Sequence, residues 1–247
     1  GGHPSYTLKS RILLNLNIIL VDKVVCVSEF VYDSYNSLEK LLVPFKKVCF
    51  INYGADRAKI KSLQPKTLTR NYFNIDKDSF LFIHTGRFVE VKNQRFLFEI
   101  INNLILNDFK CELLMVGEGP LKKDLINYAI ELNIRDSVHF TGLLARKEVY
   151  ELLNSSDALI MTSKSEGLSV SLIEAIAAQL PAVLTDIPSF RETMKIKNSA
   201  IIIDSDMDHN INVKNIIDSF NNKNFFNNMI NGIDELYEKY YNVPHMM

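Results

Sequence analysis

The sequence predicts an α/β protein built around a parallel β-sheet, and two observations lead to that prediction. Short apolar runs rich in β-branched residues alternate along the chain with longer stretches of helical periodicity, the pattern of repeated strand and helix units. The short runs are apolar at nearly every position, as expected for strands that are buried on both faces. At 247 residues the chain is long enough to bury a large core.

Eight apolar runs are expected to form the strands. They occupy residues 23–28, 47–51, 80–84, 111–116, 138–140, 158–161, 182–185 and 200–203. Apolar residues recur at helical spacing between several of them, most clearly in 93–106 and 121–132. The tail from His209 is rich in asparagine, yet its apolar residues also recur, so we expect amphipathic helices there.

Composition excludes several classes of protein. With 28 Lys and Arg against 29 Asp and Glu, the net charge is −1, and 47% of residues are hydrophobic. This is the composition of a globular protein and not of a disordered, collagen-like or coiled-coil chain. A balanced charge creates no broad positive field, so we predict no nucleic-acid partner and expect any anionic partner to be small.

The cysteines and the apolar runs bear on the cellular compartment of the protein. Cys26, Cys49 and Cys111 each lie inside an apolar run without paired spacing, so we expect buried strand residues. No run reaches the roughly 20 apolar residues that cross a membrane. We see no signal segment, and we therefore predict a cytoplasmic protein.

The most informative segment for chemistry is 163–178. It follows the strand expected at 158–161, passes through Gly167, and enters a helix expected to begin near Ser169. A strand, a tight turn and a helix N-terminus bring backbone N–H groups and the positive helix end together, which suits a phosphate. Glu166 and Glu174 bracket this crevice and can accept hydrogen bonds from hydroxyls. The implied ligand is a sugar nucleotide, although spacing alone favours two solvated glutamates around a helix start.

A resemblance strengthens the ligand interpretation. Glu166 and Glu174, with seven residues between them, resemble the E-x7-E motif of the retaining glycosyltransferases of family four, which have the GT-B fold. Further segments agree with that family in order and spacing across residues 20–205. These are Val27-Ser28-Glu29, Ile51-Asn52-Tyr53-Gly54-Ala55-Asp56, Gly86-Arg87 with Lys92-Asn93, Val116-Gly117-Glu118-Gly119-Pro120, Phe140-Thr141-Gly142, and Thr185-Asp186 with Glu192.

The resemblance implies roles for individual residues. Glu166 is expected near the transferred sugar and Glu174 on the ribose hydroxyls, while Arg87 and Lys92 are expected to clamp the diphosphate without a metal or other cofactor. The catalytic set is thus Glu166, Arg87 and Lys92, and the donor is a UDP-, GDP- or ADP-sugar. The full donor-binding set is Gly86, Arg87, Lys92, Gly117, Gly142, Leu143, Glu166, Gly167, Leu168, Ser169, Val170 and Glu174.

The resemblance also implies a domain organisation. Residues 1–56 would be the end of an N-terminal Rossmann-like domain, 57–77 a linker, 78–208 the C-terminal nucleotide-sugar-binding Rossmann-like domain, and 209–247 a helical tail. Roughly 100–150 further residues are expected on the N-terminal side. That missing domain would bind a saccharide or lipid-linked acceptor, which fits polysaccharide synthesis by a protein located peripherally at the inner face of a membrane.

Three segments depart from the family pattern. Gln179 stands where glycine is usual, Ile187-Pro188-Ser189 replaces a Gly-Gly turn, and Tyr53 precedes Gly54 where the family commonly has asparagine. We expect the first two to reshape the second half of the pocket. His3 lies at a plausible separation for the family's histidine that faces the transferred sugar, and a tag remnant explains it equally well.

Other interpretations stay open. A non-catalytic sugar-nucleotide-binding fragment and a GT-B epimerase or phosphorylase are alternatives to a transferase. Gly117-Glu118-Gly119 begins like a dinucleotide fingerprint but lacks the third glycine. Asp204-Ser205-Asp206 matches a metal-binding D-x-D pattern, for which we expect a helix-capping turn instead.

Overall fold

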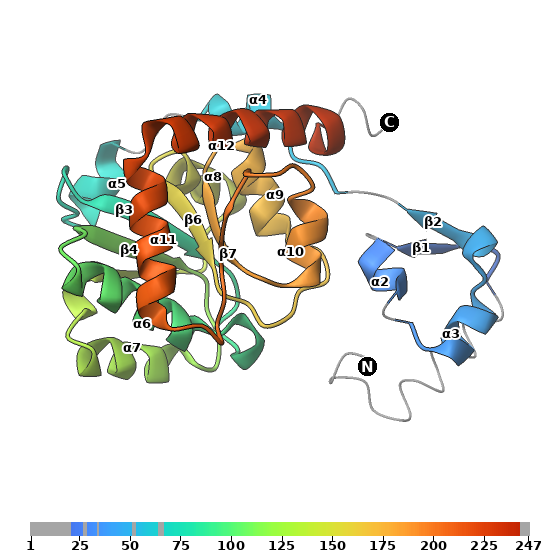
Figure 1. Ribbon diagram of the computed structural model, residues 1–247, viewed down its shortest axis with the longest axis horizontal. Coiled ribbons are helices and arrows are strands. Elements are labelled where there is room, and N and C mark those ends of the chain that lie inside the picture. The colour runs from blue at the N-terminus through green and yellow to red at the C-terminus, as the bar shows by residue number, and fades with distance from the viewer. Residues whose placement is uncertain (1–20, 27–28, 34, 51–52, 64–66, 243–247) are drawn as a thin grey trace. The chain divides into compact units, whose positions relative to one another are not determined.

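The computed structural model describes residues 21–26, 29–33, 35–50, 53–63 and 67–242 (Figure 1). The chain divides into two compact units, Gly1–Tyr53 and Gly54–Met247. The range 57–77, expected to be a linker, lies within the second unit and contains the helices α4 (Arg57–Lys61) and α5 (Thr67–Tyr72). His3, Val27-Ser28 and Ile51-Asn52 lie outside the described residues.

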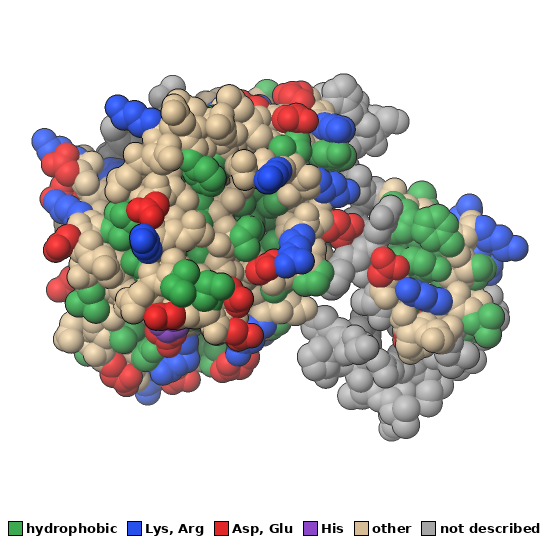
Figure 2. Space-filling model, in the orientation of Figure 1, with side chains coloured by type: hydrophobic (Ala, Val, Ile, Leu, Met, Phe, Trp, Pro, Cys, Tyr) green, Lys and Arg blue, Asp and Glu red, His purple; other side chains and the backbone are tan. Residues whose placement is uncertain are grey.

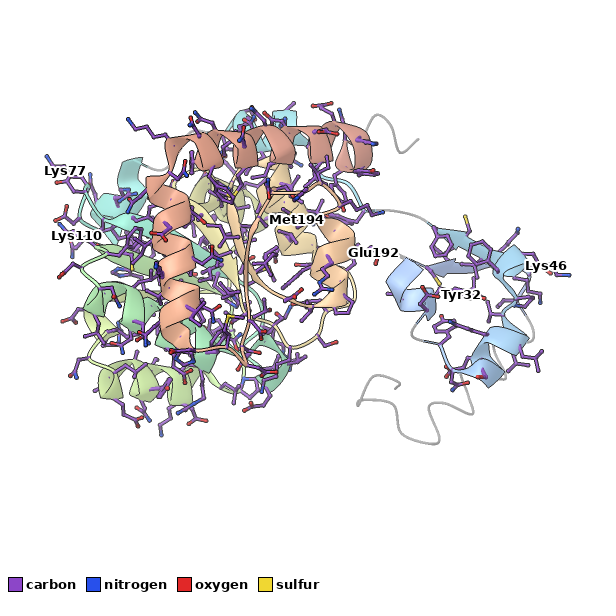
Figure 3. All side chains as sticks on the ribbon, viewed as in Figure 1. Tyr32, Lys46, Lys77, Lys110, Glu192 and Met194 are labelled. Carbon is purple, nitrogen blue, oxygen red and sulfur yellow. The ribbon has the colours of Figure 1, made fainter. Side chains whose placement is uncertain are left out.

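The first unit contains a two-stranded parallel sheet, β1 (Val24–Cys26) with β2 (Val48–Phe50). Its helices are α2 (Glu29–Asp33) and α3 (Ser37–Leu42), followed by a 3-10 turn at Phe45–Lys47. Tyr32 lies inside this unit (Figure 3), and its hydroxyl donates to the Val43 carbonyl oxygen at 3.1 Å. Because Cys26 and Val43 are also buried, this small core forms around the tyrosine ring.

The prediction that every cysteine is buried is wrong for Cys49. Cys26 and Cys111 are buried, whereas Cys49 is exposed. In the part of this unit that the structure describes, β2 pairs only with β1, and side chains alternate between the two faces of this small sheet. Burial on both faces also fails at Ile202, which is 39% exposed in a strand at the edge of the larger sheet.

The second unit is built on a six-stranded parallel sheet, and the α/β prediction is confirmed. Its strands are β3 (Phe80–Thr85), β4 (Cys111–Val116), β5 (Val138–Gly142), β6 (Ala158–Met161), β7 (Ala182–Thr185) and β8 (Ile201–Ile203). Their order is β5-β4-β3-β6-β7-β8. The chain therefore builds the sheet outward from β3 in one direction and then from β6 in the other, which creates a switch point between β3 and β6.

Helices flank this sheet. They are α6 (Gln94–Leu106), α7 (Lys122–Glu131), α8 (Arg146–Leu153), α9 (Val170–Ala177), α10 (Pro188–Thr193), α11 (His209–Asn221) and α12 (Lys223–Leu236), with short 3-10 turns at Glu90–Lys92 and Arg135–Ser137 and a π-helical turn at Tyr237–Tyr241. Helix α11, orange in Figure 1, crosses the near face of the sheet and packs against α6. Helix α12 packs against α9.

The asparagine-rich tail is helical, as its periodicity predicts. Asparagine contributes here as a cap, because the Asn222 side chain accepts hydrogen bonds from the first backbone N–H groups of α12. Before α11, the Asp206 N–H donates to the Asp204 side chain at 2.9 Å, so the D-x-D segment forms a turn. The residue that caps α11 is Asp208, and not a member of the D-x-D segment.

The described surface is mixed in charge. Figure 2 shows acidic and basic side chains interspersed over the visible face of the second unit. Among the described residues, no group of three or more His, Cys, Asp or Glu side chains is arranged to hold a metal. None of the described helices combines the length and apolar composition needed to cross a bilayer.

Arg57 ties the start of the second unit to its C-terminal helices. Its Nε donates to the Ala177 carbonyl oxygen at the end of α9 at 3.1 Å, and its Nη1 lies 3.0 Å from Asp234 on α12. The guanidinium also stacks on the Tyr237 ring at 3.9 Å from the ring centroid. A charged donor at the carbonyl end of a helix is favourable, so one side chain joins α4, α9 and α12.

We expect Arg57→Ala to lower the free energy of unfolding by about 2–3 kcal/mol, because it removes charge-assisted hydrogen bonds and a cation–π contact at a mostly buried site. Chemical denaturation monitored by circular dichroism measures this loss. Lys59→Ala is the matched control, since Lys59 is an exposed residue of the same helix. Equal stabilities of the two variants would contradict the proposed importance of Arg57.

Candidate functional site

A cavity of about 530 Å³ lies at the carboxyl edge of the sheet. Figure 3 helps to find this edge, because Lys77 and Lys110 precede β3 and β4 and so mark the opposite, amino edge. The loops after β3, β4 and β5 and the helices α8 and α9 line the cavity. The lining residues are Thr85, Gly86, Arg87, Val116, Gly117, Glu118, Gly119, Leu143, Leu144, Val149, Ser171 and Glu174. This is the edge at which open parallel sheets bind ligands.

Glycines allow the loops after β3, β4 and β5 to meet at backbone distance. The Gly86 N–H donates to the Val116 carbonyl oxygen and the Gly117 N–H to that of Gly142, both at 3.0 Å. Gly117 has a φ of +137°, and a Cβ there would lie 2.0 Å from the Gly86 carbonyl oxygen. Any side chain at position 117 would therefore push the loops apart.

Arg87 supplies a positive charge to the cavity. It follows β3 directly, and its side chain is exposed. Within the described part of the chain, its guanidinium makes no hydrogen bond or ion pair. An arginine fork without an internal partner can bind the paired oxygens of a phosphate or carboxylate.

The structure brings Lys92 and Glu166 together, although they are 74 positions apart in the sequence. Lys92 Nζ lies 2.5 Å from Glu166 Oε1, and the Ser163 hydroxyl donates to the same oxygen at 2.6 Å. Their loops are joined through the Thr162 hydroxyl, which donates to the Asn93 carbonyl oxygen at 3.0 Å. Neither Lys92 nor Glu166 lines the cavity, but both are mostly buried.

The lysine and the cavity are nevertheless neighbours. A Cβ added at Gly86, which lines the cavity, would lie 3.8 Å from Lys92 Cε. Arg87 and the Lys92–Glu166 pair thus flank one glycine after β3.

Helix α9 begins as the sequence predicts. Ser169 is its N-cap, and the Ser169 hydroxyl accepts a hydrogen bond from the Leu172 N–H at 3.3 Å. Four residues expected to bind the donor, Gly167, Leu168, Ser169 and Val170, do not line the cavity, and neither does Gly142. Of the expected set, the cavity walls contain Gly86, Arg87, Gly117, Leu143 and Glu174.

Glu174 faces the cavity from α9 and is 7% exposed. Its Oε1 accepts a hydrogen bond from the Tyr150 hydroxyl at 3.2 Å and lies 3.3 Å from Arg146 Nε. Burial raises the pKa of this carboxyl, and the charge of Arg146 and the Tyr150 hydrogen bond oppose that rise. Nothing in the sequence pattern singles out Arg146 or Tyr150, because their importance depends on where α8 packs.

His84 is buried and is linked through Gln94 to the backbone of Arg87. No pattern in the sequence identified this role of His84. Its Nδ1 lies 3.0 Å from the Ile160 carbonyl oxygen, so the neutral ring donates there and presents Nε2 as an acceptor. Gln94 Nε2 lies 3.5 Å from that nitrogen and donates to the Arg87 carbonyl oxygen at 3.0 Å. Burial lowers the pKa of His84 to about 4, which keeps the ring neutral near pH 7.

Neither Gln179 nor Ile187-Pro188-Ser189, the two segments expected to reshape the second half of the donor pocket, lines this cavity. Gln179 lies at the C-terminal end of α9 with a φ of +60°, which explains why glycine suits this position. Its side chain donates to Asp234 on α12 at 2.6 Å, so the glutamine joins two helices away from the site.

Comparison with known proteins now identifies the family. Residues 65–235 match the family described as glycosyl transferases group 1. The chain belongs to the group 1 glycosyltransferases. An uncharacterized glycosyltransferase of Methanocaldococcus jannaschii is 34% identical over 52% of the chain and 31% of that relative. The Escherichia coli UDP-Gal:alpha-D-GlcNAc-diphosphoundecaprenol alpha-1,3-galactosyltransferase is 26% identical over 86% of the chain and 54% of that protein. The matched regions thus span about a third to a half of these relatives.

Solved structures confirm the GT-B-type, Rossmann-like fold of this group 1 chain. A glycosyltransferase from Rickettsia africae superposes with a TM-score of 0.81 at 17% identity, over 99% of the chain and 66% of that protein. Anabaena HepE, solved in complex with UDP-glucose, gives a TM-score of 0.78 at 15% identity, over 99% of the chain and 67% of HepE. At these identities the likeness establishes the fold alone.

We expect the free energy of unfolding to fall as the pH is lowered from about 6.5 toward 4, since unfolded His84 binds a proton in this window while the buried ring does not. Across the window His84 contributes at most about 3 kcal/mol. His84→Asn should flatten the dependence, which denaturant melts at several pH values measure. His209→Asn, on α11, is the control, and equal slopes for wild type and His84→Asn would contradict the assignment.

Proposed function

We propose that this chain carries the donor-binding part of a retaining, metal-independent glycosyltransferase that transfers a sugar from a nucleotide sugar to a saccharide or lipid-linked acceptor. The observation that supports this most is one cavity that contains both the guanidinium of Arg87, which has no partner among the described residues, and the buried carboxylate of Glu174. The first suits a diphosphate, and the second suits a pair of hydroxyls. A nucleoside diphosphate presents both groups in one molecule.

Arg87 and Lys92 would stabilise the departing nucleoside diphosphate. Charge builds up on the leaving phosphate as the glycosidic bond breaks, and preorganised cations lower the barrier without a metal. In the structure Lys92 Nζ forms an ion pair with Glu166 Oε1 at 2.5 Å. In the proposed complex the phosphate pairs with Lys92 and the hydroxyls of the sugar donate hydrogen bonds to Glu166. Both charged side chains therefore keep a partner.

The transferred sugar would lie next to Glu166, which accepts hydrogen bonds from its hydroxyls. Front-face displacement with retention asks the protein mainly for positioning and for charge stabilisation. Anabaena HepE, which shares the fold, was solved with UDP-glucose, and this supports a nucleotide sugar as the donor. The Escherichia coli relative is named for a diphosphoundecaprenol substrate, which supports a lipid-linked acceptor and a role in polysaccharide synthesis.

Titration with UDP and GDP tests the Arg87 assignment. We expect one of them to bind saturably, and Arg87→Gln to weaken that binding by about 10- to 100-fold, the effect of losing charged hydrogen bonds to phosphate. Isothermal calorimetry measures both affinities. Arg95→Gln is the matched control, because Arg95 is an exposed arginine of α6 that does not line the cavity. No saturable binding, or no effect of Arg87→Gln, would contradict the proposed site.

Glu166→Gln should separate sugar binding from nucleotide binding. UDP lacks the transferred sugar that Glu166 would contact, and the substitution frees Lys92, so the variant should bind UDP at least as tightly as wild type. In the full-length protein the same substitution should lower kcat for sugar transfer by about 100-fold or more. Calorimetry and a release assay for the nucleoside diphosphate measure the two effects. Transfer at the wild-type rate would contradict the role of Glu166, and an inactive full-length wild type would favour a binding protein.

A further inference from the structure

Helix α8 directs two polar side chains at Glu174. Arg146 and Tyr150 are one turn apart on this helix, and residues at this spacing lie on the same face. Val149, between them in sequence, lines the cavity together with Glu174. The helix therefore supplies part of the cavity wall and, beside it, a hydrogen-bond donor and a cation for one carboxylate.

The tyrosine hydroxyl and the guanidinium both contact the same oxygen of Glu174. The Tyr150 hydroxyl donates to Oε1 at 3.2 Å, and Arg146 Nε lies 3.3 Å from Oε1. Within the described residues, Oε2 accepts no hydrogen bond. Oε1 therefore faces both the tyrosine hydroxyl and the guanidinium, and Oε2 is left for a ligand in the cavity.

The burial of Glu174 makes these contacts necessary. A carboxylate removed from water tends to take up a proton, and a protonated carboxyl loses part of its capacity to accept hydrogen bonds from hydroxyls. The Tyr150 side chain is buried as well, whereas 60% of the Arg146 side chain is exposed. Arg146 lies on the solvent side of Glu174, and its positive charge offsets the cost of burying the carboxylate.

The other groups around α9 do not replace these two contacts. Arg57 from α4 contacts the last carbonyl oxygens of α9, and Asp234 and Tyr237 face Arg57 from the C-terminal helices. Arg87 and Glu118 line the cavity from the loops after β3 and β4. Among all these groups, only Arg146 and Tyr150 contact the Glu174 carboxylate directly.

We propose that Arg146 and Tyr150 are positioning residues that hold the Glu174 carboxylate ionised and oriented, so that Oε2 accepts the hydroxyls of the ribose of a nucleoside diphosphate. This inference rests on the proposed function and adds to it the pair of residues that sets the preference for a ribose over a deoxyribose. Arg146 and Tyr150 act through Glu174, and their effect should depend on pH and on the ribose 2′-hydroxyl.

The test compares UDP with 2′-deoxy-UDP (or GDP with 2′-deoxy-GDP, if GDP is the nucleotide that binds) by calorimetry on the whole chain. Arg146→Gln should weaken ribonucleotide binding about tenfold and Tyr150→Phe several-fold. For the deoxynucleotide, which lacks the 2′-hydroxyl, the same substitutions should change the affinity by less than half of these factors. Lys147→Gln is the matched control, since it removes one positive charge from the neighbouring exposed position of the same helix. This control should change neither affinity.

The pH dependence of ribonucleotide affinity distinguishes a positioning role of Arg146 and Tyr150 from a merely structural one, which would leave this dependence unchanged. Ribonucleotide affinity should fall at low pH as Glu174 takes up a proton. Without Arg146 the pKa of Glu174 rises further, so in Arg146→Gln the fall should begin at higher pH. Tyr150→Phe, which keeps the ring and its packing, guards against a loss that only reflects misfolding.

The outcomes separate the two proposals. If the wild type binds neither UDP nor GDP, the proposed function fails. If the wild type binds and Arg146→Gln weakens ribo- and deoxyribonucleotide equally, or behaves as Lys147→Gln, the proposed function stands and the positioning role is overturned. A selective loss for the ribonucleotide together with the shifted pH profile supports the role.

Discussion

The candidate site depends on the close approach of three loops at the carboxyl edge of one parallel sheet. Backbone hydrogen bonds link Gly86 to Val116 and Gly117 to Gly142, and glycine at 117 is required because a Cβ would meet the Gly86 carbonyl oxygen. The switch of strand order between β3 and β6 leaves space at this edge. The backbone thus forms the cavity, and the side chains of a few residues give it chemistry.

Both glutamates of the E-x7-E segment contact cationic side chains. Lys92 pairs with Glu166, and Arg146 contacts Glu174. Mostly buried charges are costly unless they are paired, and these two contacts give each carboxylate a cationic partner. In the proposed complex, a bound diphosphate would replace the negative partner that Lys92 loses when it leaves Glu166.

The supports of the site lie farther from the cavity. His84 and Gln94 fix the backbone of Arg87 from below. At the other end of α9, Arg57 binds the last carbonyl oxygens of the helix, and Gln179 joins it to α12. The helix that carries Glu174 is therefore held at its C-terminal end by side chains that belong to α4 and α12. The asparagine-rich tail contributes to the site in this indirect way.

Local sequence determined much of this protein. Apolar runs located the strands, helical periodicity located α6 and the tail helices, and E-x7-E put Glu166 before α9 and Glu174 on it, because these features depend on neighbours a few residues apart. Only the tertiary structure decided that Arg146 and Tyr150 meet Glu174, that His84 supports Arg87, and that Cys49 is exposed. Those outcomes depend on which elements pack together, and a pattern within one segment carries no information about its partner.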